Sequence, residues 1–179
     1  TRVRSSAASD VYKRQGRQFV LTGNYPYDIS SQIFFKMLEY KDLIPCCTGM
    51  IQREVAQRMA AGPGSKTYGI LSVLMQAWYN VEYLFTVDEN VFNPPPKVKS
   101  AVIRMTRNEV TDIGCDQVLF KRVVKTVFNQ RRKMLRVSLR QIFNAVKPTD
   151  GFYEQDIMTK RPEQLSIAVS YTHLRAHET

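Results

Sequence analysis

The chain has 179 residues, of which 44% are hydrophobic and 11% are aromatic. This composition excludes a disordered chain and suffices for one domain with a core plus a small appendage. Lysine and arginine number 26 against 16 acidic residues, which gives a formal charge of +10. Such an excess favours a polyanionic partner, either a nucleic acid or an anionic membrane surface.

Several protein classes are disfavoured by what the sequence lacks. No run approaches the ~18 apolar residues of a membrane span, and no apolar signal core follows the basic N-terminus, so a cytoplasmic protein is expected. The three cysteines, Cys46, Cys47 and Cys115, have no metal-binding spacing and are expected to be reduced thiols. Because both histidines, His173 and His177, lie in the last few residues, neither a histidine-containing triad nor a metal site is expected.

Strands and helices alternate in the first part of the chain. Residues 18–23 predict a short strand that ends in a polar turn, and Ser30 or Ser31 is expected to cap the helix that follows. Residues 45–51 predict a second strand, and residues 52–61 predict a helix. The first helix has apolar residues at helical spacing: Ile33, Phe34, Met37 and Leu38. This order of elements favours a parallel α/β sheet.

The pattern changes in the second part of the chain. Residues 68–78 predict a third helix, and strand-like runs at 81–87 and 100–106 predict an antiparallel edge of the sheet. The proline-rich segment 92–97 lies between these runs as a stiff loop, because proline cannot join a central ladder. After residue 115 the apolar residues keep a helical rhythm until Pro148 to Gly151 breaks it: Val124, Val127, Phe128, Leu135, Leu139 and Ile142.

The expected organisation is therefore the C-terminal part of a Rossmann-like sheet at residues 16–107, a linker at 108–114 and a small helical domain at 115–169. Residues 1–15 and 170–179 show no apolar period and are expected to be non-native flanks. The basic excess remains without the first flank, which holds more basic than acidic residues.

The segment Asn24-Tyr25-Pro26-Tyr27 follows the first predicted strand, at the position where open α/β sheets bind ligands. The exocyclic amine of adenine is a poor nucleophile, and acceptors for its hydrogens favour a more reactive, tetrahedral nitrogen. The Asn24 side-chain carbonyl and the Pro26 backbone carbonyl are suitable acceptors, and the Tyr27 ring offers a face for the base. An ordinary β-turn is the alternative interpretation, because Asn, Pro and Tyr are common turn residues.

With four further motifs in order, this segment resembles the ribosomal RNA adenine dimethyltransferase family from about Gly16 to Ala168. The likeness is greatest to the branch that acts on bacterial small-subunit RNA. Tyr25 stands where the family usually has an aliphatic residue, at a position that mainly packs. The four further motifs are Gln52 to Arg58, Gly62 to Val73, Phe92 to Val102 and Phe128 to Arg136.

The resemblance implies dimethylation of two adjacent adenosines in small-subunit ribosomal RNA, with S-adenosylmethionine as cofactor and the pre-30S particle as partner. It implies that Asn24 contacts both cofactor and target amine, and that Tyr27 and Phe92 enclose the base. Simple packing is the alternative for Phe92, because an aromatic residue beside prolines is often structural.

Basic residues are concentrated in the predicted helical domain. Residues 121–147 contain nine lysines or arginines and no acidic residue. A solvated helix face is one interpretation, and contact with RNA phosphates is the other and the preferred one. The predicted RNA-binding residues are Arg53, Arg58, Lys66, Lys97, Arg131, Arg132, Lys133 and Arg136.

No Gly-x-Gly motif precedes Asn24, although the resemblance implies a glycine-rich cofactor loop there. The chain is therefore expected to be a fragment that binds the cofactor poorly and is inactive alone. An RNA-binding assembly factor without catalysis is an alternative function. A related methyltransferase of the antibiotic-resistance type, acting on large-subunit RNA, is another, although Gly62 to Val73 is more similar to the small-subunit branch.

Overall fold

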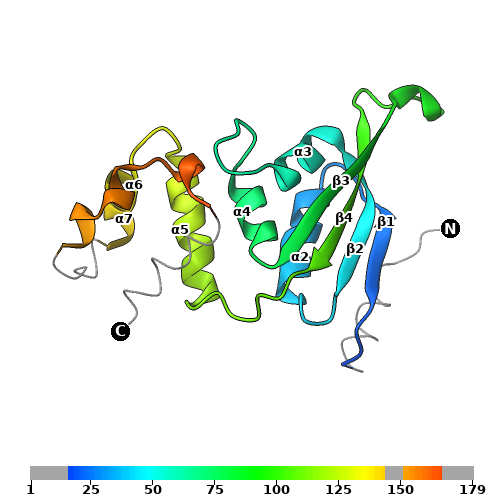
Figure 1. The fold of residues 1–179 in the computed structure, drawn as a ribbon. Helices are drawn as coiled ribbons and strands as arrows, with labels where there is room; N and C mark the ends of the chain where they lie inside the picture. The colour runs from blue at the N-terminus through cyan, green and yellow to red at the C-terminus, as the bar shows by residue number, and fades with distance from the viewer. Residues whose placement is uncertain (1–15, 144–150, 167–179) are drawn as a thin grey trace. The chain divides into compact units, whose positions relative to one another are not determined.

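The computed structural model describes residues 16–143 and 151–166 (Figure 1). The described residues form two compact units, one made of residues 16–57 and 78–109 and the other of residues 58–77, 110–143 and 151–166. The division at 109/110 falls inside the predicted linker, and the second unit also takes in residues 58–77. The predicted flanks at 1–15 and 170–179 lie outside the described residues, and the predicted domain limits stay a prediction.

The first unit, called the sheet unit below, contains a four-stranded sheet in the order β1-β2-β4-β3. β1 (Val20–Asn24) runs parallel to β2 (Cys46–Gln52), and α2 (Ser30–Glu39) connects them. β4 (Ser100–Arg107) is antiparallel both to β2 and to β3 (Tyr79–Val87). The predicted α/β class, with a parallel pair and an antiparallel edge, is confirmed (Figure 1).

The core of the sheet unit follows from the two-residue period of its strands. In β4, Ala101, Ile103 and Met105 are fully buried, while Arg104 and Thr106, at alternate positions, are exposed. On the exposed face, Arg104 Nη2 donates to Glu82 Oε2 of the neighbouring strand over 2.6 Å. The alternation therefore assigns one face of β4 to the core and the other to polar pairing.

The start of α2 differs from the prediction. Ile29 occupies the cap position without a side-chain cap, and Ser30 is already the first helical residue. The Ser30 hydroxyl instead donates to the backbone oxygen of Tyr27 over 3.3 Å. A serine within the helix does not cap its own first turn, because the capping residue itself has non-helical backbone angles. The apolar face is confirmed by Phe34 and Met37, which are buried.

The second unit, called the helical unit, consists of short helices. It contains α4 (Ile70–Gln76), α5 (Gln117–Asn129), α6 (Leu135–Ser138) and α7 (Arg140–Phe143). Three 3₁₀ turns follow: Phe152–Glu154, Asp156–Thr159 and Pro162–Gln164. The remaining helix, α3 (Arg53–Ala60), spans the division between the units at 57/58.

The residues with a helical rhythm after residue 115 are divided among separate helices in the structure. α5 ends at Asn129, the chain turns, and α6 begins at Leu135. The N–H of Leu135 donates to the Lys160 backbone oxygen over 2.9 Å. The periodic residues are buried nonetheless, including Val124, Val127 and Leu139. Periodicity identifies which side chains are inside, but not whether one helix carries them all.

Candidate active site

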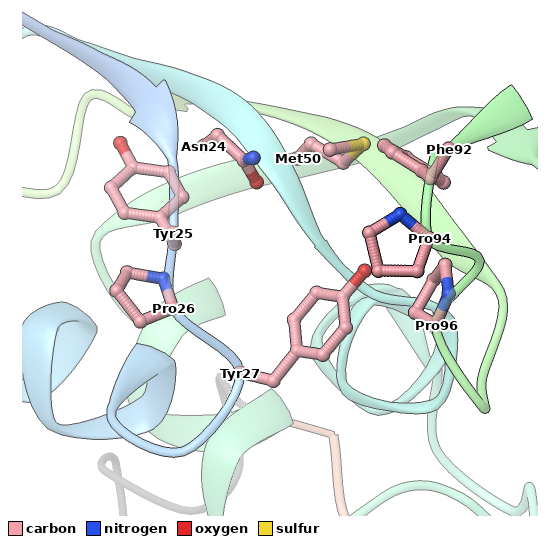
Figure 2. A pocket seen from close by; sticks show the side chains of 8 residues that line it. All are labelled: Asn24, Tyr25, Pro26, Tyr27, Met50, Phe92, Pro94 and Pro96. Carbon is pink, nitrogen blue, oxygen red and sulfur yellow. The ribbon is translucent and has the colours of Figure 1, made fainter. Parts of the chain in front are cut away.

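A pocket of about 380 Å³ opens at the C-terminal end of β1, within the sheet unit. The predicted segment Asn24 to Tyr27 forms one side, and the loop between β3 and β4 forms the other. Figure 2 shows that side chains from both segments border the same open space. The lining residues are Asn24, Tyr25, Pro26, Tyr27, Met50, Phe92, Pro94 and Pro96.

Asn24 is the last residue of β1 and is exposed at the pocket. The parallel register places it opposite Met50 of β2, and the next residue, Tyr25, donates its backbone N–H to the Met50 oxygen over 2.9 Å. Pairing with β2 thus fixes the backbone at Asn24 and at Tyr25, the residue that follows it. In Figure 2 the amide end of Asn24 is directed toward the centre of the pocket.

The backbone carbonyl of Pro26 is already a hydrogen-bond acceptor in the structure. It receives the N–H of Ile29 over 3.3 Å, within the turn that leads into α2. A carbonyl oxygen has two lone pairs, so one remains for another donor. The two predicted acceptors therefore lie in one turn that is held by its own backbone hydrogen bonds.

Tyr27 is half-buried and contributes an aromatic ring to the pocket. Its hydroxyl is hydrogen-bonded to the hydroxyl of Ser100, a fully buried residue at the start of β4. Phe92, also half-buried, lines the pocket from the β3–β4 loop (Figure 2). The structure therefore brings together all the residues of the predicted base site, although their roles stay predictions.

Polar contacts hold the loop that carries Phe92. The Asp88 carboxylate accepts from the Asn90 N–H over 3.1 Å and from Lys99 Nζ over 2.9 Å. These hydrogen bonds, that of Lys99 first, hold the pKa of the Asp88 carboxyl below its usual range. The two ends of the loop are thereby tied together, which orders the proline segment between them.

Tyr25 packs beneath the turn, as predicted, with only 6% of its surface exposed. Its ring meets Phe34 of α2 edge-on, with centroids 5.2 Å apart. Its hydroxyl lies 3.2 Å from Cys47 Sγ and 3.3 Å from the Thr48 oxygen. Burial raises the pKa of the tyrosine hydroxyl, and it raises the pKa of the Cys47 thiol to about 12. Both groups stay neutral at physiological pH and serve packing.

Gly49 makes room for this arrangement. A Cβ atom on Gly49 would lie 2.0 Å from the Gly23 oxygen and 2.6 Å from Cε2 of the Tyr25 ring. No side chain fits at that separation, so the close approach of β1 and Tyr25 to β2 requires glycine here.

Sequence reasoning missed four residues of this site: Met50, Pro94, Pro96 and Ser100. The parallel pairing of β1 with β2 was predicted, but not the register that sets Met50 opposite Asn24. Ser100 begins the predicted strand 100–106, and no local pattern reveals that its hydroxyl contacts that of Tyr27, 73 residues earlier. Both contacts depend on strand register.

The predicted RNA-binding residues divide between the two units. Arg53 and Lys97 are exposed in the sheet unit, and Arg58, Lys66, Arg132, Lys133 and Arg136 are exposed in the helical unit. Arg131 differs, because it is half-buried and its guanidinium contacts three atoms of the helical unit. Their contact with RNA stays a prediction.

Two further findings concern ligands and membranes. In residues 16–143 and 151–166, no three His, Cys, Asp or Glu side chains are grouped so as to hold a metal ion. Over the same residues, no helix has both the length and the apolar character needed to cross a bilayer. Among the residues that line the pocket, Asn24 is the one that the family resemblance implies to contact a cofactor.

The fold places the chain with Rossmann-like methyltransferases. It is similar to the crystal structure of a dimethyladenosine transferase from Plasmodium falciparum, with a TM-score of 0.77 and 25% identity over 88% of this chain and 66% of that one. It also shares its fold with the 23S rRNA methyltransferase ErmE, at a TM-score of 0.59 and 20% identity over 96% and 79% of the two chains.

Residues 5–170 match the profile of the family described as ribosomal RNA adenine dimethylase, and the chain belongs to this family. The ribosomal RNA small subunit methyltransferase A of Phocaeicola vulgatus is 72% identical over 152 residues, which are 85% of this chain and 53% of that protein. The chain spans little more than half the length of the curated relatives that it matches, from 53% to 58% in the first five.

Proposed function

We propose that this chain forms the adenine-binding part of a methyltransferase that dimethylates two adjacent adenosines of small-subunit ribosomal RNA. The observation that carries the proposal is the pocket, which the Asn24 amide lines together with the rings of Tyr27 and Phe92. High identity to relatives named for small-subunit methylation supports the choice of substrate. The pre-30S particle is the proposed partner, and the cytoplasm the proposed location.

The residues of the pocket have separate tasks in this proposal. The target adenine lies flat between Tyr27 and Phe92, out of its stack. The Asn24 side-chain oxygen and the Pro26 backbone oxygen accept hydrogen bonds from the adenine amine. These hydrogen bonds favour a tetrahedral nitrogen, whose lone pair can attack the methyl group. Ser100 holds the Tyr27 ring in place through the hydroxyl contact.

S-adenosylmethionine is the proposed cofactor, and when bound it supplies an electrophilic methyl group. Asn24 is the residue of this chain proposed to touch it. The glycine-rich loop that the family resemblance implies ahead of Asn24 is not in the printed sequence. No general base is assigned among the side chains that line the pocket. The amine nitrogen is positively charged directly after it accepts the methyl group, so it loses its proton readily.

The test is methyl transfer to undermethylated small subunits, with the full reading frame that contains this chain. Asn24→Ala is expected to lower kcat/KM by about 100-fold to 1,000-fold, the usual loss when one transition-state contact is removed. Asn80→Ala is the matched control, because Asn80 is an exposed amide on β3 that does not line the pocket. Equal activity in Asn24→Ala and the wild type would remove Asn24 from the mechanism.

A second candidate is an RNA-binding assembly factor without catalysis. The exposed cations of the helical unit favour it, because they need no cofactor to bind RNA. RNA binding without methyl transfer, in both the wild type and Asn24→Ala, would support this candidate against the enzyme.

A further inference from the structure

The segment between α3 and α4, called the 62–67 loop below, is mostly exposed but well held. Ser65 Oγ donates to the Gly62 oxygen over 2.9 Å and accepts from the Tyr68 N–H over 3.2 Å. Tyr68 follows as a fully buried anchor, with its ring edge-on to Phe128 and its hydroxyl donating to the Leu165 oxygen over 3.2 Å. Lys66 is exposed on this loop.

Arg131 joins the loop to two other parts of the helical unit. Its Nη1 donates to the Lys66 oxygen over 2.7 Å and its Nη2 to the Ser65 oxygen over 3.0 Å. Its Nε donates to Glu163 Oε2 over 2.6 Å. The Glu163 backbone oxygen in turn accepts the Gly64 N–H over 2.7 Å. Arg131, Glu163 and the loop thus form one closed set of contacts, called the clasp.

We propose that Arg131 and Glu163 are positioning residues for RNA binding, and that the clasp brings Lys66 beside Arg132 and Lys133 to form one phosphate-binding surface. In the clasp, the Arg131 guanidinium is hydrogen-bonded directly to the Lys66 backbone. The exposed cations Arg132 and Lys133 follow Arg131 directly in the sequence. Cations gathered in this way repel one another, and phosphate oxygens relieve that repulsion. The inference rests on the proposed RNA substrate.

Direct binding of phosphate by Arg131 is the competing explanation. A guanidinium has five N–H donors in a planar fork, and here each of its three nitrogens already donates within the protein. Glu163 also places a negative charge 2.6 Å from Nε, which opposes a phosphate at that edge. These contacts therefore favour a positioning role for Arg131 over direct binding of phosphate by its guanidinium.

The experiment measures binding of a fluorescent RNA hairpin, with two adjacent adenosines in its loop, as a function of salt concentration. Lys66→Gln and Arg132→Gln should each weaken binding about fivefold at 0.15 M salt and lower the logarithmic salt slope by about 1. Glu163→Gln is the decisive variant. It keeps an oxygen that can accept from Arg131 Nε but removes the negative charge, so charge alone predicts tighter binding, whereas a clasp loosened by loss of the ion pair predicts weaker binding.

A double-mutant cycle separates position from contact. If the clasp acts through Lys66, then Glu163→Gln and Arg131→Gln should have little further effect in the Lys66→Gln background. Arg131→Lys keeps the charge but loses the fork, and it should behave as Arg131→Gln does. Circular dichroism melts of each variant confirm that it is folded at the assay temperature, and Arg161→Gln, an exposed arginine near Glu163, is the matched control.

Each outcome decides the question. Tighter binding by Glu163→Gln, additive losses in the cycle, or full rescue by Arg131→Lys would overturn the clasp and make Arg131 a direct ligand. If the wild-type chain does not bind the hairpin at all, the RNA surface falls together with the clasp, while the Asn24 test of methyl transfer stands separately.

Discussion

The pocket in the sheet unit and the basic surface in the helical unit are both formed by short turns, but different forces hold them. The turn at Asn24 is fixed by strand register and by the buried ring of Tyr25, which packs on Gly49 and Phe34. The 62–67 loop is held chiefly by hydrogen bonds that Arg131 donates to it and by one that the Glu163 backbone oxygen accepts from it, and both residues are partly exposed. A site held by packing tolerates little change in volume, and a surface held by polar contacts responds to charge and salt.

The largest effect is expected at Gly49, which tests whether packing holds the pocket. Gly49→Ala should lower the free energy of unfolding by about 3 kcal/mol or more, because its Cβ would lie 2.0 Å from a backbone oxygen of β1. Urea denaturation measures the loss. Gly62→Ala is the control and should change stability by about 0.5 kcal/mol or less, because nothing lies within 4 Å of a Cβ there. Equal stability of the two variants would show that the sheet unit is not held as described.

A smaller effect is expected at Asp116, in the helical unit. Its side chain caps α5 by accepting the Leu119 N–H over 2.7 Å. Asp116→Ala should therefore lower the unfolding free energy by about 1 kcal/mol, and Asp116→Ser should restore most of it, because serine also caps helices well. Urea denaturation again measures the change. A loss in Asp116→Ser as large as in Asp116→Ala would argue against the cap.

The smallest change concerns the alkaline limit of stability. The Cys47 thiol has its pKa raised by burial from 9.0 to about 12, and the Tyr68 hydroxyl from 10.0 to about 12. A raised pKa in the folded state means that stability is full below the unfolded pKa and is lost as pH rises toward the folded one. The unfolding free energy should therefore begin to fall near pH 9.

Cys47→Ala tests the origin of this fall. Without the thiol, the decline should begin about one pH unit higher, where the buried tyrosine begins to contribute. Denaturation at a series of pH values between 8 and 11 measures the onset. An unchanged onset in Cys47→Ala would assign the alkaline limit to other groups.

The four main strands and the first two helices were predictable because their apolar residues follow simple periods. Phe34 and Met37 of α2 and the alternating residues of β4 are buried where the pattern placed them. The cap of α2 was predicted wrongly, and the division of the residues after 115 into separate helices was not predicted. Ser30 lies inside its helix, and a turn that holds Arg131 divides α5 from α6.

The sequence alone picked out the residues proposed to carry the chemistry: Asn24, Pro26 and Tyr27 fall within one four-residue segment, and Phe92 stands beside its prolines. Only the tertiary structure decided that Met50 lies opposite Asn24, that Ser100 holds Tyr27, and that Arg131 turns inward to Glu163 while Arg132 stays exposed. The physical reason is that local patterns report burial and turn propensity, whereas hydrogen bonds between distant residues depend on register and on the path of the chain.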